Sequence, residues 1–138
     1  MPASNYAINK VLNNVFGATS ASVPATMYFG LSTEVMTAAT LGTLSTEPAT
    51  AMGYARKSAT NDHTTWTTST VQTLASDIAI VFDASTDVWG LIRAVFIADS
   101  GTRAAGNIWW YYNFSPAFEV GDSTQITLAS GTIVATMT

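Results

Sequence analysis

The sequence predicts an all-β protein, a jelly-roll-like antiparallel β-sandwich of about eight strands with one N-terminal amphipathic helix. Three observations lead to this fold class. After residue 18 the apolar residues recur with a period of two. Clusters of Asp, Asn, Ser and Gly separate these segments at short intervals. Thr, which suits a pleated sheet, is abundant. We therefore expect one domain over residues 1–138, with a helix at 4–17 and a sandwich at 24–138.

The first element is a helix, because its apolar residues follow a period of three and four. This apolar stripe consists of Ile8, Val11, Leu12, Val15 and Phe16. Ser4 is the expected N-terminal cap, and Gly17 is the expected left-handed end of the helix. A single amphipathic helix before a sandwich either closes one end of it or docks on a neighbouring subunit.

The strands follow from alternation and from turn residues. The expected strands are residues 27–32, 53–61, 77–82, 88–98, 107–114, 125–129 and 132–137, with a turn or a short edge strand at 61–70. The strand at 53–61 places Tyr54 and Arg56 on one face. Residues 88–98 and 107–114 form a hairpin, and Pro116 ends its second strand. Residues 34–51 are expected to form a long loop, of the kind that is usually functional or an interaction arm.

The composition favours a surface that ends up against other proteins. Charged residues make up 10% of the chain and hydrophobic residues 48%, whereas a lone monomer usually carries more charge. The net charge is −4 and the basic residues form no cluster, which argues against nucleic acid as a partner. There is no cysteine, no apolar segment long enough to cross a membrane, and no signal peptide, so we expect neither disulfides nor a membrane.

Few residues suggest chemistry, and we expect no enzyme and no cofactor. His63 is the single histidine, and Asp62 beside it would point to the opposite face of a strand. With one His and no Cys a zinc site is nearly excluded. Asp83 and Asp87 flank a turn and could hold Ca²⁺, but they lack EF-hand spacing. Most other carboxylates stand at expected turns, where Asp accepts backbone hydrogen bonds.

The strand at 107–114 carries the most distinctive pattern. Strict alternation directs Ile108, Trp110, Tyr112 and Phe114 to one face, and directs Trp109 and Tyr111 to the other. The second set of rings has three alternative roles. It forms a protein–protein interface, it belongs to a second buried layer covered by the helix or the long loop, or it is a platform on which sugars stack. The candidate interface residues are Trp109, Trp110, Tyr111, Tyr112, Phe114, Trp66, Val11 and Val15.

Several segments together resemble one family of phage proteins. These segments are residues 9–17 (NKVLNNVFG), 27–33 (MYFGLST), 53–56 (GYAR), 84–90 (ASTDVWG) and 106–111 (GNIWWY). In this order they resemble the capsid decoration, or cement, proteins of tailed bacteriophages, over about residues 5–135. The chain departs from the family pattern at Ala105, where the family often has glycine.

The resemblance implies a non-enzymatic virion protein. Its expected place is the exterior of an HK97-type capsid, where it would cement neighbouring capsomers after assembly in the host cytoplasm. Its expected partners are the major capsid protein and a second copy of itself in a homodimer. The alternative is a tail-fibre-like or receptor-binding, glycan-binding β-sandwich module of the virion. A copy number per virion would distinguish the two.

Overall fold

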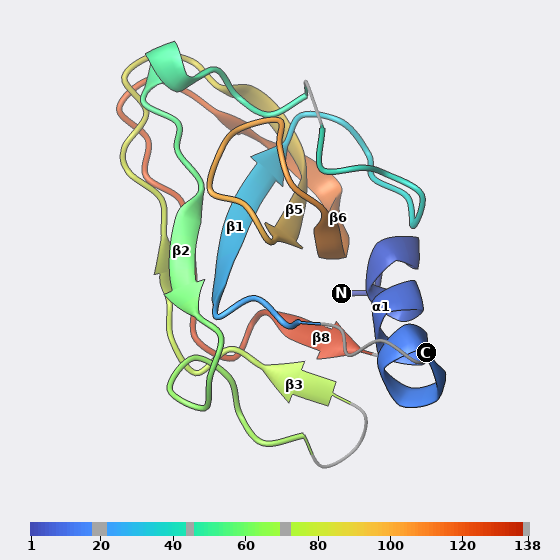
Figure 1. The fold of residues 1–138 in the computed structure, drawn as a ribbon. Coiled ribbons are helices and arrows are strands. Elements are labelled where there is room, and N and C mark those ends of the chain that lie inside the picture. Colours follow the sequence, from blue (N-terminus) through green and yellow to red (C-terminus); the bar gives the residue numbers. More distant parts are fainter. Residues whose placement is uncertain (18–21, 44–45, 70–72, 137–138) are drawn as a thin grey trace.

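The computed structural model describes residues 1–17, 22–43, 46–69 and 73–136. It contains one α-helix, one short 3₁₀ helix and eight strands (Figure 1). These elements are α1 (Asn5–Phe16), β1 (Thr26–Ser32), η1 (Thr50–Met52), β2 (Lys57–Thr60), β3 (Thr73–Ala75), β4 (Ile80–Val81), β5 (Gly90–Ala98), β6 (Ile108–Val120), β7 (Thr127–Leu128) and β8 (Val134–Thr136).

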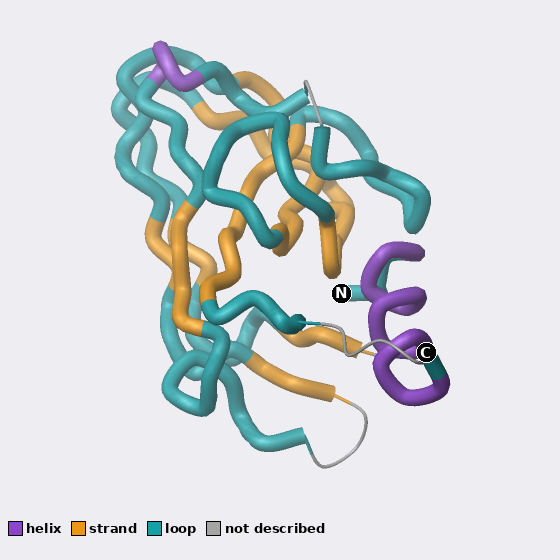
Figure 2. The backbone as a smooth tube through the Cα atoms, viewed as in Figure 1, coloured by secondary structure: helices purple, strands orange, loops and turns teal. Residues whose placement is uncertain are grey.

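The strands form antiparallel sheets, and the expected fold class is confirmed. The main sheet has four strands in the order β2-β1-β5-β6, and β3 pairs with β8 while β4 pairs with β7. In Figure 1 the β3–β8 pair lies below the main sheet, and α1 stands beside it. Long loops connect the strands, as Figure 2 shows by colour. The result is a β-sandwich-like protein with one short N-terminal helix.

The principal core lies between the main sheet and the short sheets. Alternate residues of the main sheet, such as Phe29, Leu31 and Ile97, are almost fully buried in it. Ile80 and Ile133 enter the same cluster from the opposite layer. Period-two alternation therefore predicts this face correctly, because both layers direct their apolar side chains inward.

The other face of the main sheet is also covered, by loops rather than by strands. Met36 from the loop after β1 packs on Phe96 and Ile108, with Tyr111 partly buried against the same cluster. The side chain of Asn113 fixes this loop, since its Oδ1 accepts from Met36 N at 2.9 Å and its Nδ2 donates to Met36 O at 2.9 Å. The long loop expected at 34–51 thus covers part of the sheet.

The helix begins as expected but ends differently. Ser4 caps it, with its Oγ accepting from the backbone N–H of Ala7 at 3.2 Å. Gly17 is not left-handed, as expected, but extended, with φ −91° and ψ 159°. Its N–H donates to the Asn13 carbonyl at 2.9 Å, and a Cβ built on Gly17 would lie 2.4 Å from that oxygen. The glycine therefore serves close approach of the backbone rather than a positive φ.

Strand β6 departs from the expected strand at 107–114 in two ways. It runs through Pro116 to Val120, so the expectation that Pro116 ends it is wrong. Pro116 lies between Asn113 and Phe118, where the pairing of β6 with β5 shifts register, and β6 is an edge strand of the main sheet, so the missing N–H is tolerated. The second departure is a β-bulge, because Ile97 pairs with Trp110 whereas Ala98 pairs with Ile108.

The bulge overturns the expected alternation of aromatic faces. Trp109 is the extra residue, and it shares a face with Trp110, at 5.9 Å between ring centroids in a stacked arrangement. Tyr112 lies opposite Val95 of the principal core, whereas Tyr111 lies opposite Phe96 on the other face. Trp109 therefore faces the principal core, on the side opposite to Tyr111.

Other expected strands exist but are shorter. The strand expected at 53–61 is β2, only Lys57–Thr60, and the strand expected at 77–82 is β4, only Ile80–Val81. The sequence pattern misses β3, Thr73–Ala75. The strands expected at 125–129 and 132–137 are the short β7 and β8; residue 137 lies outside the described residues.

Candidate functional site

The exposed half of α1 presents an apolar surface. The first turns pack on the protein, with Ala7 fully buried and Tyr6 meeting Trp109 edge to face at 5.4 Å. The second half does not, and Val15 is 64% exposed and Phe16 83% exposed. We call the following four residues the α1 apolar surface: Val11, Leu12, Val15 and Phe16. The apolar stripe predicted from the sequence is thus partly buried at Ile8 and exposed from Val11 to Phe16.

The aromatic residues predicted as an interface divide into buried and accessible ones. Trp109 is 3% exposed and belongs to the core of this chain. Trp110, Tyr111 and Phe114 are partly buried. Tyr112 is 48% exposed, and its ring meets that of Phe114 edge to face at 5.7 Å. Their role in subunit contact stays a prediction, and Tyr112 offers the most accessible ring for it.

Trp66 has a different setting from the β6 aromatics. It lies in the loop after β2, where it forms an isolated bridge with Ser76, and its ring packs 6.0 Å from that of Phe29. It is partly buried against the principal core. Trp66 also lines a cavity that it shares with Trp109 and Trp110.

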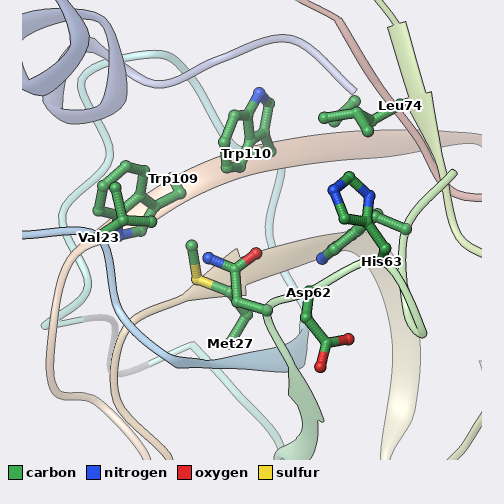
Figure 3. A pocket seen from close by; sticks show the side chains of 10 residues that line it. Val23, Met27, Asp62, His63, Leu74, Trp109 and Trp110 are labelled. Carbon is green, nitrogen blue, oxygen red and sulfur yellow. The ribbon is translucent and has the colours of Figure 1, made fainter. Parts of the chain in front are cut away.

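This cavity has a volume of about 280 Å³ and is lined mainly by apolar side chains. Its lining residues are Val23, Met27, Asn61, Asp62, His63, Trp66, Leu74, Trp109, Trp110 and Ala135. They come from the start of β1, the 61–66 loop, and strands β3, β6 and β8. Figure 3 shows the two β6 indoles side by side, with Asp62 and His63 on the loop across from them. We call it the tryptophan cavity.

Two indole groups of this cavity have unused hydrogen-bond donors. The Nε1 atoms of Trp109 and Trp110 are buried, and neither has an acceptor in the part of the chain that the structure describes. Most buried indole N–H groups find a partner. Trp89, outside the cavity, follows that rule, with its Nε1 donating to Met52 O at 2.7 Å.

The polar side of the cavity comes from residues 61–63. Asn61 Nδ2 donates to Pro24 O at 2.9 Å, which leaves the amide oxygen as an acceptor. Asp62 Oδ1 accepts from both the N–H and the hydroxyl of Thr64, and these hydrogen bonds lower the pKa of Asp62. Its carboxylate is turned away from the indoles, whereas the His63 ring lies on the side of Trp110 and Leu74 (Figure 3). Asp62 therefore shapes the turn that presents His63.

A buried ionic network, which sequence patterns do not predict, ties two loops together. Glu47 and Arg56 form an ion pair at 2.8 Å, and both side chains are fully buried. Arg56 Nη1 also donates to the carbonyl oxygens of Ser100 and Ala105, at 2.7 and 2.9 Å. The guanidinium lies 5.0 Å from the centre of the Phe96 ring. The sequence signal for this network is the placement of Tyr54 and Arg56 on one face of the strand expected at 53–61.

The same network includes Tyr54 and the 99–106 turn. The Tyr54 hydroxyl donates to Glu47 Oε1 at 2.7 Å and accepts from Leu31 N at 2.9 Å. Burial, together with the nearby Glu47 carboxylate, raises the pKa of Tyr54 far above its usual range. Ala104 N donates to Glu47 Oε2 at 2.8 Å. The polar groups are hydrogen-bonded to one another, and the network joins Glu47 and Tyr54 to the backbone of β1 and of the 99–106 turn.

The carboxylates and the histidine of the described residues form no cluster that could hold a metal ion. Within ranges 1–17, 22–43, 46–69 and 73–136, no three His, Cys, Asp or Glu side chains gather as a metal site would require. Asp83 pairs with Lys57 at 2.6 Å, and Asp87 Oδ1 accepts from Val88 N, so each carboxylate that flanks the 83–87 turn has a partner within the chain. Over the same residues no helix is long and apolar enough to span a membrane.

Comparison with known proteins identifies one family. Residues 2–136 match the family model described as podophage GP4 fiber I protein gp80. No curated protein matches the sequence. The match covers almost the whole chain, helix and sandwich together.

Proposed function

Since the chain belongs to the family of the podophage GP4 fiber I protein gp80, we propose that it is a homo-oligomeric subunit of a fibre on a phage virion. A structural role in the virion follows from the family. The fibre assignment follows from the name of the protein that defines the family. We further propose that the subunit has no catalytic activity.

The α1 apolar surface is the observation that supports attachment to another subunit. Val15 and Phe16 are 64% and 83% exposed, and Val11 and Leu12 extend the same side of the helix. Burial of a Val, Leu or Phe side chain contributes about 1.5–3 kcal/mol. A neighbouring subunit that covers these residues would therefore gain several kcal/mol, and repeated contacts along a fibre would add avidity.

Capsid decoration is the second candidate, supported by the resemblance to cement proteins. In that arrangement the same surface would contact the major capsid protein, and the subunits would lie at the joints between capsomers. Both candidates use weakly charged, apolar contact surfaces. They differ in where the subunits sit and in how many a virion carries.

Image reconstruction of the phage particle tests the two candidates. A fibre subunit lies in a projection outside the shell and follows the symmetry of that projection. A cement subunit lies on the shell at capsomer joints. Density at the capsomer joints and none in a fibre would overturn the fibre proposal.

A pair of variants tests the role of α1. We expect the double substitution Val15→Ser, Phe16→Ser to leave the free energy of unfolding of the monomer within about 0.5 kcal/mol, because both side chains are exposed. It should abolish self-association in sedimentation and incorporation into particles. Val88→Ser is the matched control, since Val88 is 48% exposed at a place outside α1. Equal association of both variants would remove α1 from the interface.

A further inference from the structure

The tryptophan cavity has the size and the chemistry of a small-ligand site. Its volume of about 280 Å³ lies near the lower end of the range for small-molecule pockets. Three of the four tryptophans of the chain line it, and Met27 and Leu74 add further apolar surface. A ligand of one ring fits this volume.

The polar side chains of the lining decide which chemistry the ligand needs. The Nε1 atoms of Trp109 and Trp110 are covered by protein and are out of reach of a ligand, so these indoles offer it apolar ring surface. Hydroxyl groups on the ligand can use the polar side of the lining. The free amide oxygen of Asn61 and the imidazole of His63 add hydrogen-bonding partners for hydroxyl groups.

The charge around the cavity disfavours an anion. Asp62 belongs to the lining, and its lowered pKa keeps it ionised near neutral pH. Among the residues that the structure describes, no Lys or Arg lines the cavity. A phosphate or a carboxylate ligand would therefore meet a negative charge without a cation to neutralise it.

We propose that the tryptophan cavity binds a neutral pyranose ring, with its C–H face on the indoles and its hydroxyl groups on the polar side chains of Asn61 and His63. A sugar ring combines an apolar face with several donors and acceptors, and the lining offers both kinds of surface in one place. The inference rests on the cavity alone, and it is independent of whether the subunit lies in a fibre or on the capsid.

The indole N–H resonances of the ¹⁵N-labelled chain provide the test. Four tryptophans give four such signals, and Trp89 is an internal reference because its N–H is bound to Met52 O outside the cavity. The probes are methyl glucopyranoside, methyl galactopyranoside and N-acetylglucosamine at increasing concentrations. We expect at least one probe to shift the signals of Trp109 and Trp110 in a saturable way while the Trp89 signal stays in place.

Two variants connect binding to the cavity. His63→Ala changes an exposed side chain and should weaken binding by about five- to tenfold, as expected for loss of one hydrogen bond. Tyr112→Phe, outside the cavity, should leave binding unchanged. Absence of any saturable shift with all three sugars overturns the proposal, and so does a shift that is equal at Trp89. Binding of benzene or indole without binding of any sugar would also overturn it, and would mark the cavity as a socket for an apolar side chain of a neighbouring subunit.

Discussion

Glu47→Gln is the substitution that should destabilise the fold most for the smallest change in shape. The Glu47 carboxylate accepts four hydrogen bonds: from the Tyr54 hydroxyl at 2.7 Å, from Arg56 Nε and Nη2 at 2.9 and 2.8 Å, and from Ala104 N at 2.8 Å. In glutamine one carboxylate oxygen becomes an NH₂ group. Two of these four donors then face another donor, and Arg56 keeps its charge with a fully buried side chain.

The expected loss follows from the burial of that charge. Breaking a buried ion pair by removing one partner costs about 3–5 kcal/mol. The whole stability of a domain is about 5–15 kcal/mol, so the variant loses a large share of it. At a urea dependence of about 2 kcal/mol per M, the midpoint of unfolding should fall by about 2 M.

The exposed ion pair of the same chain is the matched control. Lys57 and Asp83 meet at 2.6 Å, but their side chains are 26% and 68% exposed, so Asp83→Asn should cost about 1 kcal/mol or less. Replacing both buried partners, as in Glu47→Leu with Arg56→Met, should be less damaging than Glu47→Gln alone, because no charge is left unpaired. Equal midpoints for Glu47→Gln and Asp83→Asn in urea titrations would refute this reasoning.

Two further predictions concern buried positions on the two faces of the main sheet. Gly30→Ala places a Cβ 2.2 Å from the Phe96 ring and should lower the free energy of unfolding, measured by calorimetry, by about 1–3 kcal/mol. Gly121→Ala is the control, because its Cβ meets one atom at 3.8 Å, and it should change that free energy by no more than about 0.5 kcal/mol. Equal losses would contradict the packing argument. The pKa of Tyr54 in the folded protein is raised above the unfolded value of about 10. The contribution of neutral Tyr54 to the free energy of unfolding is therefore complete below pH 10 and is lost as the pH rises further. Urea unfolding at several alkaline pH values should show this decline, and Tyr54→Phe should make it shallower; an unchanged slope would count against the buried Tyr54–Glu47 contact.

Local patterns in the sequence predict much of the fold. The helix is predictable because Ser4 and the apolar stripe act within a few residues of one another. The long central strand β5 is predictable because β-branched and aromatic residues fill it, and turn residues precede β6. Strand ends are less predictable, since pairing rather than the local pattern decides them: β4 is limited to the two residues that pair with β7.

The features that were not predicted depend on residues far apart in the chain. Glu47, Arg56 and Ala104 meet only after two loops close on the main sheet, and no periodicity encodes that meeting. The tryptophan cavity likewise joins β1, the 61–66 loop and three other strands. Pro116 stays within β6 because that strand is at the sheet edge and its pairing with β5 shifts register there, and both are properties of the sheet and not of the local sequence.

The bulge at Trp109 acts as a change of parity along β6. Before the bulge the even-numbered Ile108 faces the side of the sheet that carries Phe96, and after the bulge the odd-numbered Tyr111 faces that same side. Deleting a single residue there would restore strict alternation and exchange the sides of either the preceding or the following positions. When relatives are aligned through this strand, a one-residue gap at the bulge therefore means that the side chains on one side of the gap lie on the other face of the sheet. Such a gap is more than a difference in length.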